Sequence, residues 1–306
     1  MARLQCATTG KQVYLEASYL IGRSEHCLLR LEDPHVSSEH ASIRWDGAQW
    51  ILKDLGSLNR TYLDEVELTP AHSAPLRKGS RVAFGSPKQA WQLTEDAGPL
   101  PMAVPEDGSA PIVATDGLLP LPSAEEPRYT VYRDHNGSWV VDAGDRVTKV
   151  EDRGSIQLGP VRYRLCLPQP YTRTTPLHGF IGARVPELTL VFRVSSDMET
   201  IELDVTGAHS HHRFSARTHN EMLLLLGRAR RADTAAGLPP GSAGWLYHDD
   251  LCRKLQVDAE RLNVDVYRIR RQFADLGLLD PAHIIERRPR TRQIRIGVGD
   301  ISEVPL

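Results

Sequence analysis

Short segments of alternating apolar and polar residues fill the first third of this chain, and each one ends in a polar turn. Tyr19–Ile21, Ala41–Trp45 and Trp50–Leu52 place apolar side chains at every second position. A two-residue period indicates a strand that buries one face, so these segments predict the sheets of a β-sandwich. The polar residues between them are then expected in loops at one end of the sandwich, where binding residues are commonly found.

Three polar sequences lie in those loops: GR at 22–23, SSEH at 37–40 and LNRT at 58–61. A phosphate dianion is bound by a forked cation and by hydroxyl or amide donors, and a bound phosphopeptide also needs a group that holds its backbone. Arg23, Ser37 and Asn59 supply these three chemistries. The sequence therefore predicts a site for a phosphorylated peptide.

The order and spacing of the three sequences resemble the forkhead-associated (FHA) domain, a phosphothreonine-binding β-sandwich, over residues 2–94. The resemblance implies that Arg23 and Ser37 hold the phosphate and that Asn59 holds the adjacent peptide backbone. It also implies that His40 braces the loop from behind, with Gly22 as a second structural residue. The full set predicted to bind the phosphopeptide is Arg23, Ser37, Ser38, Asn59, Arg60 and Thr61.

Two positions depart from the family pattern. Arg60 stands where the family has Gly, and Leu58 stands where it has a hydroxyl residue. If position 60 has a positive φ, Arg costs about 1 kcal/mol or more relative to Gly. The missing hydroxyl removes a hydrogen bond worth roughly 1.5–3 kcal/mol if it was made to the phosphate. Arg60 could compensate as a cation at the rim; the alternative is a sandwich that keeps its loops for structure and binds an unmodified partner.

Composition limits the remaining possibilities. A chain of 306 residues accommodates two or three domains, and a net charge of -2 gives no overall attraction to nucleic acid or membrane. Its four cysteines lack a C-x-x-C spacing, which argues against a zinc site and for reduced thiols. No signal peptide or membrane span is predicted, because the longest aliphatic run is only 222–226. We therefore expect a cytoplasmic protein with no membrane partner.

The middle of the chain predicts a linker and a second β region. Seven prolines among Ala, Gly and acidic residues indicate a linker over 96–127, or a strap over a sheet. The strand and turn signals of 128–168 repeat the second half of the first domain, without its three polar loop sequences. This predicts a degenerate FHA-like β region with a structural role, or a simple hairpin extension. A second proline-containing linker is expected over 169–186.

The last part of the chain, 187–306, combines strands with helices. Two strands are predicted at 187–192 and 201–205, followed by a helix that starts in a capping box of Thr218 and Glu221. A second helix is expected at 247–255. A third is expected at 261–276, with Leu262, Val266, Ile269, Phe273 and Leu276 on one apolar face, and a basic hairpin at 284–296 should follow.

This layout resembles the winged helix of OmpR-type transcription factors, in which the third helix enters the DNA major groove and the wing reaches the backbone. Residues 210–297 carry 16 basic and 10 acidic side chains, an excess of +6. The alternative is a solvated basic face with a protein partner. The resemblance places Asn263, Tyr267, Arg268, Arg270 and Arg271 on the DNA-facing helix, and Arg287, Arg288, Arg290 and Arg292 on the wing.

No sequence pattern indicates an enzyme, a metal or a cofactor, and the His-rich stretch 209–212 is interpreted as a polar turn. The sequence thus predicts a multidomain protein with an all-β FHA sandwich (1–95), a degenerate β region and an α+β winged-helix module. We expect a regulatory adaptor that binds a phosphothreonine protein, either a Ser/Thr kinase or its substrate, or this chain's own Thr115. Its output would be double-stranded DNA binding. The alternative is a scaffold with protein partners at both ends.

Overall fold

The structure is a computed structural model that describes residues 1–69, 72–169, 180, 182–288 and 290–306. The chain divides into two compact units, one of residues 1–101 and 166–173 and the other of residues 102–165 and 174–306. Within the described ranges, no helix is both long and apolar enough to cross a membrane.

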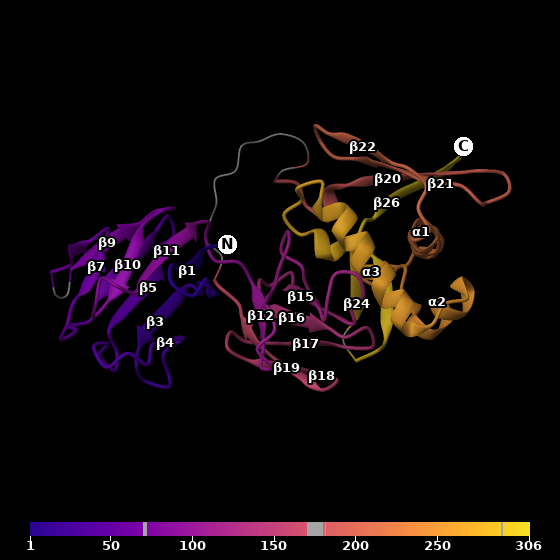
Figure 1. The fold of residues 1–306 in the computed structure, drawn as a ribbon. Helices are drawn as coiled ribbons and strands as arrows, with labels where there is room; N and C mark the ends of the chain where they lie inside the picture. The colour runs from indigo at the N-terminus through magenta and orange to yellow at the C-terminus, as the bar shows by residue number, and fades with distance from the viewer. Residues whose placement is uncertain (70–71, 170–179, 181, 289) are drawn as a thin grey trace. The chain divides into compact units, whose positions relative to one another are not determined.

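Two sheets form most of the first unit (Figure 1). Their order follows no simple meander, because strands distant in sequence lie next to one another. The first sheet has the order β2 (Gln12–Tyr14), β1 (Arg3–Cys6), β11 (Ala90–Glu95), β10 (Arg81–Phe84), β7 (Thr61–Leu63), β8 (Val66–Glu67). The second has the order β4 (Leu29–Arg30), β3 (Ser18–Gly22), β5 (Ala41–Trp45), β6 (Trp50–Asp54), β9 (Ser73–Leu76).

The alternation seen in the sequence places one face of each strand in a shared core. Ile21, Ile43 and Leu52 from one sheet and Phe84 from the other belong to a single buried cluster. The turn between β5 and β6 is closed by Asp46, whose Oδ1 accepts hydrogen bonds from the amides of residues 48 and 49 at 2.9 and 2.8 Å. The predicted strands and this predicted turn are confirmed.

The second unit begins inside the segment predicted as a linker. Prolines are compatible with edge strands and turns, and residues 102–121 contain three short strands rather than a free connection. The β region therefore starts well before residue 128. One sheet has the order β13 (Ile112–Val113), β12 (Met102–Pro105), β19 (Val161–Cys166), β18 (Ser155–Leu158); the other has β14 (Leu119–Leu121), β15 (Tyr129–Arg133), β16 (Trp139–Asp142), β17 (Val147–Lys149).

The second predicted linker, 169–186, lies largely outside the described residues. The short 3-10 helix η1 (Val185–Glu187) marks its end. A four-stranded sheet follows, in the order β22 (His211–Phe214), β21 (Ile201–Thr206), β20 (Thr189–Val194), β26 (Asp300–Pro305). Strand β26, which the sequence did not predict, pairs in parallel with β20.

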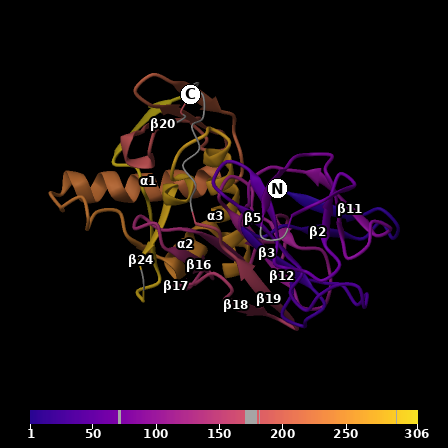
Figure 2. The ribbon, with the colours of Figure 1, turned by 90° about the vertical axis from the view of Figure 1, so that its left-hand side faces the viewer.

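Three helices follow: α1 (Asn220–Ala235), α2 (His248–Leu255) and α3 (Ala259–Ala274). Helix α1 packs on β21 of this sheet, and α2 packs against α1 and α3. Figure 2 shows α1 from the side, and Gly227 of α1 lies against Phe192 of β20, where an added Cβ would be 3.1 Å from the ring. The predicted Thr218 capping box is wrong. The N-cap of helix α1 is His219, one residue later, and it makes no side-chain cap hydrogen bond.

Helix α3 begins at Ala259, where the Asp258 side chain accepts a hydrogen bond from the amide of Arg261 at 2.7 Å. Its predicted apolar stripe, from Leu262 to Phe273, is buried in the main core of this unit. The predicted hairpin is also present. It pairs β24 (Ile285–Arg288), which follows the 3-10 helix η2 (Pro281–Ile284), with β25 (Gln293–Ile296), and β25 also pairs with β23 (Leu246–Tyr247).

Candidate functional site

The first predicted loop sequence, Gly22-Arg23, packs directly on the second. A Cβ at Gly22 would lie 2.2 Å from the carbonyl oxygen of Ser38, so only glycine permits this close approach. Two backbone hydrogen bonds then join the loops. The amide of Arg23 donates to the Ser37 carbonyl at 3.0 Å, and the amide of Ser24 donates to the Ser38 carbonyl at 3.1 Å.

The Arg23 side chain is exposed and has no hydrogen-bond or ion-pair partner among the residues that the structure describes. The neighbouring Ser38 side chain is also exposed, and its hydroxyl likewise has no partner within the described ranges. A free guanidinium and a free hydroxyl on adjoining loops form a donor set suited to an anion.

Ser37 has a double role in this loop. Its hydroxyl oxygen accepts a hydrogen bond from the amide of Leu58 at 3.1 Å, which joins the second loop sequence to the third. Its amide donates to Nδ1 of His40 at 3.1 Å. Because the hydroxyl oxygen is used as an acceptor, the hydroxyl proton remains available for an incoming phosphate oxygen.

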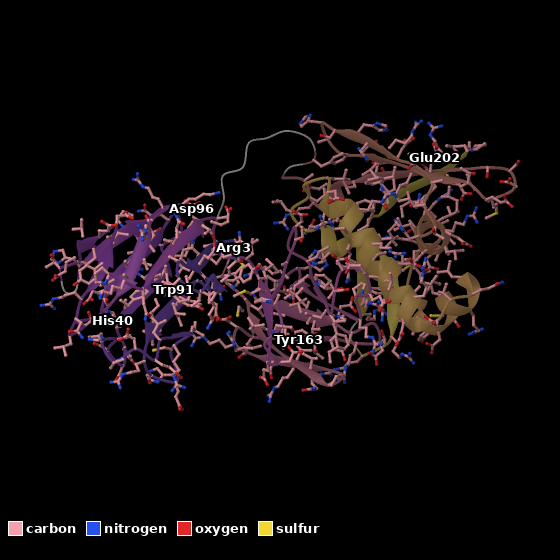
Figure 3. The ribbon with its side chains drawn as sticks, in the orientation of Figure 1. Arg3, His40, Trp91, Asp96, Tyr163 and Glu202 are labelled. Carbon is pink, nitrogen blue, oxygen red and sulfur yellow. The ribbon has the colours of Figure 1, made fainter. Side chains whose placement is uncertain are left out.

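His40, which is labelled in Figure 3, is fully buried. Its ring is nearly perpendicular to the ring of Phe84, with centroids 5.8 Å apart. Its Nδ1 accepts from the Ser37 amide, so Nε2 must carry the proton that it donates to the Arg60 carbonyl oxygen at 3.0 Å. Burial lowers the pKa of His40, in keeping with this neutral form. The imidazole connects two of the three loop sequences.

Asn59 is half-buried, and its side-chain nitrogen donates to the carbonyl oxygen of His35 at 2.9 Å. His35 is in turn held by Asp33, whose Oδ1 lies 2.8 Å from both its amide and its Nδ1. The sequence reasoning missed both residues. They position the carbonyl oxygen of His35 for Asn59, which is 24 residues away in the sequence, and no local sequence pattern indicates such a contact.

A buried carboxylate organises the third loop. Asp54 accepts hydrogen bonds from the hydroxyls of Ser57 and Thr61 at 2.5 and 2.6 Å, and from the amides of Gly56 and Ser57 at 2.8 and 3.0 Å. Burial alone would raise the pKa of Asp54, but these hydrogen bonds hold it below its ordinary value. Thr61 is therefore misplaced in the predicted phosphopeptide set, because it is fully buried and its hydroxyl is directed at Asp54.

The two unusual residues of this loop behave differently. Arg60 has a φ of 66°, the left-handed conformation expected of a position where the family has Gly. Its guanidinium lies 3.2 Å from Glu67 and 3.3 Å from the Ser57 carbonyl oxygen, so its charge is partly balanced within the domain. Leu58 is 84% exposed and presents an apolar side chain at the rim.

Comparison with known proteins agrees with this geometry. The FHA domain family model matches residues 19–85. Residues 19–85 form an FHA domain. The FHA domain-containing protein FhaB of Mycobacterium tuberculosis is 40% identical over 80 residues, which cover 26% of this chain and 50% of FhaB. The chain thus spans about half the length of this curated relative.

Solved FHA domains also match this part of the chain. The FHA domain of FhaA, complexed with an intracellular domain, is 30% identical, with a TM-score of 0.28 and coverage of 30% of this chain and 99% of that one. Another comes from a structural and functional analysis of phosphothreonine-dependent FHA domain interactions. It is 30% identical, with a TM-score of 0.27 and coverage of 31% and 95%.

Outside the FHA domain, the residues predicted to contact DNA are largely engaged within the second unit. Arg270 has no exposed surface, and its guanidinium lies 2.8 Å from the Asp142 carboxylate. It also donates to the Tyr132 hydroxyl at 3.2 Å and to the carbonyl oxygens of residues 282 and 285, each at 2.9 Å. Its side chain cannot reach DNA without leaving these partners.

Arg287 and its neighbours complete the same buried group. Its Nε lies 2.9 Å from Asp142, and it also donates to Asn263 at 2.9 Å and to the Gly144 carbonyl oxygen. Tyr267 is 5% exposed and packs with Tyr132 in a small apolar cluster. Assigning Tyr267, Arg270 and Arg287 to a DNA-facing surface is therefore wrong for this structure, because strands β15 and β16 supply their partners.

The remaining predicted DNA-binding residues are more accessible. Arg268 lies 3.8 Å from Asp265, Arg271 lies 3.2 Å from Asp116, and Arg292 lies 3.1 Å from Asp249. Arg288 covers one face of the Trp245 ring at 4.5 Å. Arg290 is exposed, and its side chain has no ion-pair partner in the described part of the chain. These cations do not form the continuous free strip expected for a DNA-binding face.

Proposed function

We propose that this protein is an adaptor that binds phosphothreonine-containing peptides through its FHA domain. One observation carries the proposal: the Arg23 guanidinium is exposed and unpaired among the described residues, on a loop whose backbone is hydrogen-bonded to that of Ser37 and Ser38. A cation with several fixed donors and adjacent hydroxyls is suited to a phosphate dianion. The likeness to FHA domains studied for phosphothreonine-dependent interactions supports the same ligand.

We assign three roles to the residues of the site: phosphate binding, peptide-backbone binding and loop positioning. Arg23, Ser37 and Ser38 bind the phosphate, and Asn59 holds the peptide backbone from the facing loop. His40 and Gly22 keep the loops in position without touching the ligand. Leu58 offers an apolar contact to a side chain near the phosphothreonine, while Arg60 adds only part of its charge because Glu67 lies 3.2 Å from it.

The proposed ligand is tested by fluorescence anisotropy of the full chain with one peptide carrying phosphothreonine, phosphoserine or threonine. Arg23→Ala should abolish binding of the phosphothreonine peptide and leave the melting temperature unchanged. The matched control is Arg44→Ala, which removes an exposed cation from β5, a strand of the same domain. Equal affinity of Arg23→Ala and wild type would exclude this site, and equal affinity for the threonine peptide would exclude phosphate recognition.

For the second unit we propose a scaffolding role with protein partners, rather than duplex DNA binding. This is supported by the burial of Arg270, Arg287 and Tyr267 against β15 and β16. DNA binding would have to use the accessible arginines, of which only Arg290 lacks a neighbouring partner in the described ranges; these are Arg268, Arg271, Arg288, Arg290 and Arg292.

Titration of the full chain against random duplex DNA at several salt concentrations separates the two roles. Each phosphate contact contributes about 0.9 to the slope of log affinity against log salt. DNA binding through the hairpin predicts that Arg290→Ala with Arg292→Ala flattens this slope by up to about two. We expect no salt-dependent binding, and a slope that responds to these substitutions would favour the DNA-binding role.

A further inference from the structure

A cavity of about 670 Å³ opens in the second unit, between the turn that joins β15 to β16 and the start of β24. His135 from that turn and His283 from η2 both line it. With Asp280 they form a group of three side chains whose possible ligand atoms all lie within 4.8 Å of one another. Neither the FHA site nor the buried Asp142 group uses these residues.

The buried imidazole of His283 lacks a hydrogen-bond partner among the described residues. The residue is 7% exposed, yet neither of its ring nitrogens has a hydrogen-bond partner among the described residues. The nearest carboxylate oxygen, Oδ2 of Asp280, lies 3.6 Å from Nδ1, beyond hydrogen-bonding distance. A buried polar group without a partner is costly, and such groups in native proteins commonly bind a water molecule or an ion.

The two carboxylates near the histidines, Asp280 and Glu286, are each oriented by a hydrogen bond to one of their oxygens. Oδ1 of Asp280 accepts a hydrogen bond from the amide of Val185 at 2.8 Å, which leaves Oδ2 facing His283. Oε2 of Glu286 accepts from Nε of Arg295 at 2.6 Å, which leaves Oε1 at 3.4 Å from Nε2 of His135. Each carboxylate therefore has one oxygen held by a hydrogen bond, as ligating carboxylates commonly do, and a second oxygen that faces an imidazole. Oδ2 of Asp280 also lies 3.8 Å from a guanidinium nitrogen of Arg184.

We propose that His135, Asp280 and His283 bind a divalent transition-metal ion of the Zn²⁺ class. Glu286 lies outside this group of three, and its Oε1, 3.4 Å from Nε2 of His135, would move to the ion as the fourth ligand. Tetrahedral Zn²⁺ with bonds of about 2.0–2.1 Å separates its ligand atoms by about 3.3 Å. The separation of 3.6 Å between Oδ2 of Asp280 and Nδ1 of His283 is close to that spacing. Two imidazoles and two carboxylates are ligands that Zn²⁺ accepts, and the carboxylates balance its charge.

One adjustment is required for coordination. The rings of His135 and His283 are stacked, with centroids 3.5 Å apart and planes inclined by 27°. In-plane lone pairs of stacked rings do not converge on one ion, so the His135 ring must turn out of the stack. His135 is exposed and lies in a turn, which leaves its side chain room to do so. The ion would then fasten the β15–β16 turn to η2 and β24.

Zn²⁺ titration of the chelator-treated full chain by isothermal calorimetry tests the proposal, with Co²⁺ absorption as a direct report of ligation. We expect one ion per chain, and a loss of affinity of at least about tenfold in His135→Ala and in His283→Ala. Asp280→Asn should weaken binding while keeping the oxygen that accepts from Val185. The matched control is His211→Ala with His212→Ala, which removes two imidazoles from the His-rich stretch and should leave affinity unchanged.

Several results would overturn the proposal. These are absence of saturable Zn²⁺ binding, unchanged affinity in both His135→Ala and His283→Ala, or loss of binding in the His211/His212 control. Binding of inorganic phosphate to the metal-free chain, removed by His283→Ala, would instead assign the cavity to an anion. If circular dichroism shows that His283→Ala does not fold, the Zn²⁺ affinity of the His135→Ala variant, which changes an exposed residue, tests the proposal.

Discussion

The carboxylate of Asp142 and the guanidinium of Arg270 lie 2.8 Å apart, and almost none of either side chain is exposed. Asp142 also forms an ion pair with Arg287, so one buried carboxylate is the counter-ion of two buried guanidinium groups. Burial alone would raise the pKa of Asp142, but Arg287 and Arg270 hold it below its ordinary value. This group joins strand β16 to helix α3 and strand β24 within the second unit.

Asp142→Asn should therefore destabilise the second unit by about 3–5 kcal/mol, because it leaves two buried guanidinium groups without a counter-charge. Urea unfolding followed by circular dichroism measures the change in free energy. Asp145→Asn, at an exposed residue of the following loop, is the matched control and should have almost no effect. Similar stability of the two variants would show that Asp142 is not required there.

The buried neutral state of His40 predicts a pH dependence of stability. Burial lowers the pKa of His40 in the folded protein. Below the ordinary histidine pKa of about 6.5, the unfolded chain therefore binds a proton at His40 more readily than the folded chain does. Its contribution to stability is therefore complete above that pH and decreases as the pH falls through it. The difference in melting temperature between wild type and His40→Asn should shrink from about pH 7.5 to about pH 5.5.

Two other buried histidines with lowered pKa values, His219 and His248, titrate equally in wild type and in His40→Asn. The difference between the two proteins therefore isolates His40. A difference that stays constant over this pH range would contradict the assigned neutral tautomer.

Arg60→Gly should stabilise the FHA domain by up to about 1 kcal/mol, because glycine adopts the observed φ of 66° without strain. The same change removes the exposed contact with Glu67, which is worth about 0–1 kcal/mol and offsets part of the gain. Glu67→Gln removes that ion pair alone, so its change in unfolding free energy can be subtracted from that of Arg60→Gly. Net destabilisation beyond the Glu67→Gln value, in denaturant unfolding, would contradict the strain argument.

Thr61→Val and Ser37→Ala should separate stability from binding. Thr61→Val removes the hydrogen bond to the buried Asp54 and should cost about 1–3 kcal/mol of stability with unchanged phosphopeptide affinity. Ser37→Ala removes a hydroxyl of the proposed phosphate site and should mainly weaken affinity. Calorimetric melting and peptide anisotropy on both variants test this. Loss of affinity in a folded Thr61→Val chain would return Thr61 to the binding set.

The FHA domain could be predicted because its signals are local. Alternation placed the strands of Ile43 and Leu52, and the short loop sequences placed Gly22, Arg23 and His40 where strands end. Thr61 was misassigned for a physical reason. It is the last residue of the third loop sequence but also the first residue of β7, and its side chain is buried.

Helix α3 shows where sequence reasoning fails. Its apolar stripe was identified correctly, but a second stripe of Asn263, Tyr267, Arg270 and Ala274 follows the same helical spacing. A polar stripe covered by another part of the chain has the same sequence pattern as one that faces solvent or DNA. The partners Tyr132 and Asp142 lie more than one hundred residues away, with separations of 138 and 128 positions. The His135–His283 group was missed for the same reason.

The parallel pairing of β20 with β26 has a consequence for biosynthesis. Thr189 and Asp300, which share a side-chain hydrogen bond across these strands, are 111 positions apart. Strand β20 therefore leaves the ribosome long before its neighbour has been made, and one of its edges stays unsatisfied throughout synthesis of the three helices. Such non-local pairing slows folding and exposes a strand edge to misassembly. This sheet can be completed only after translation has passed residue 305, whereas both sheets of the first unit consist of strands within the first hundred residues.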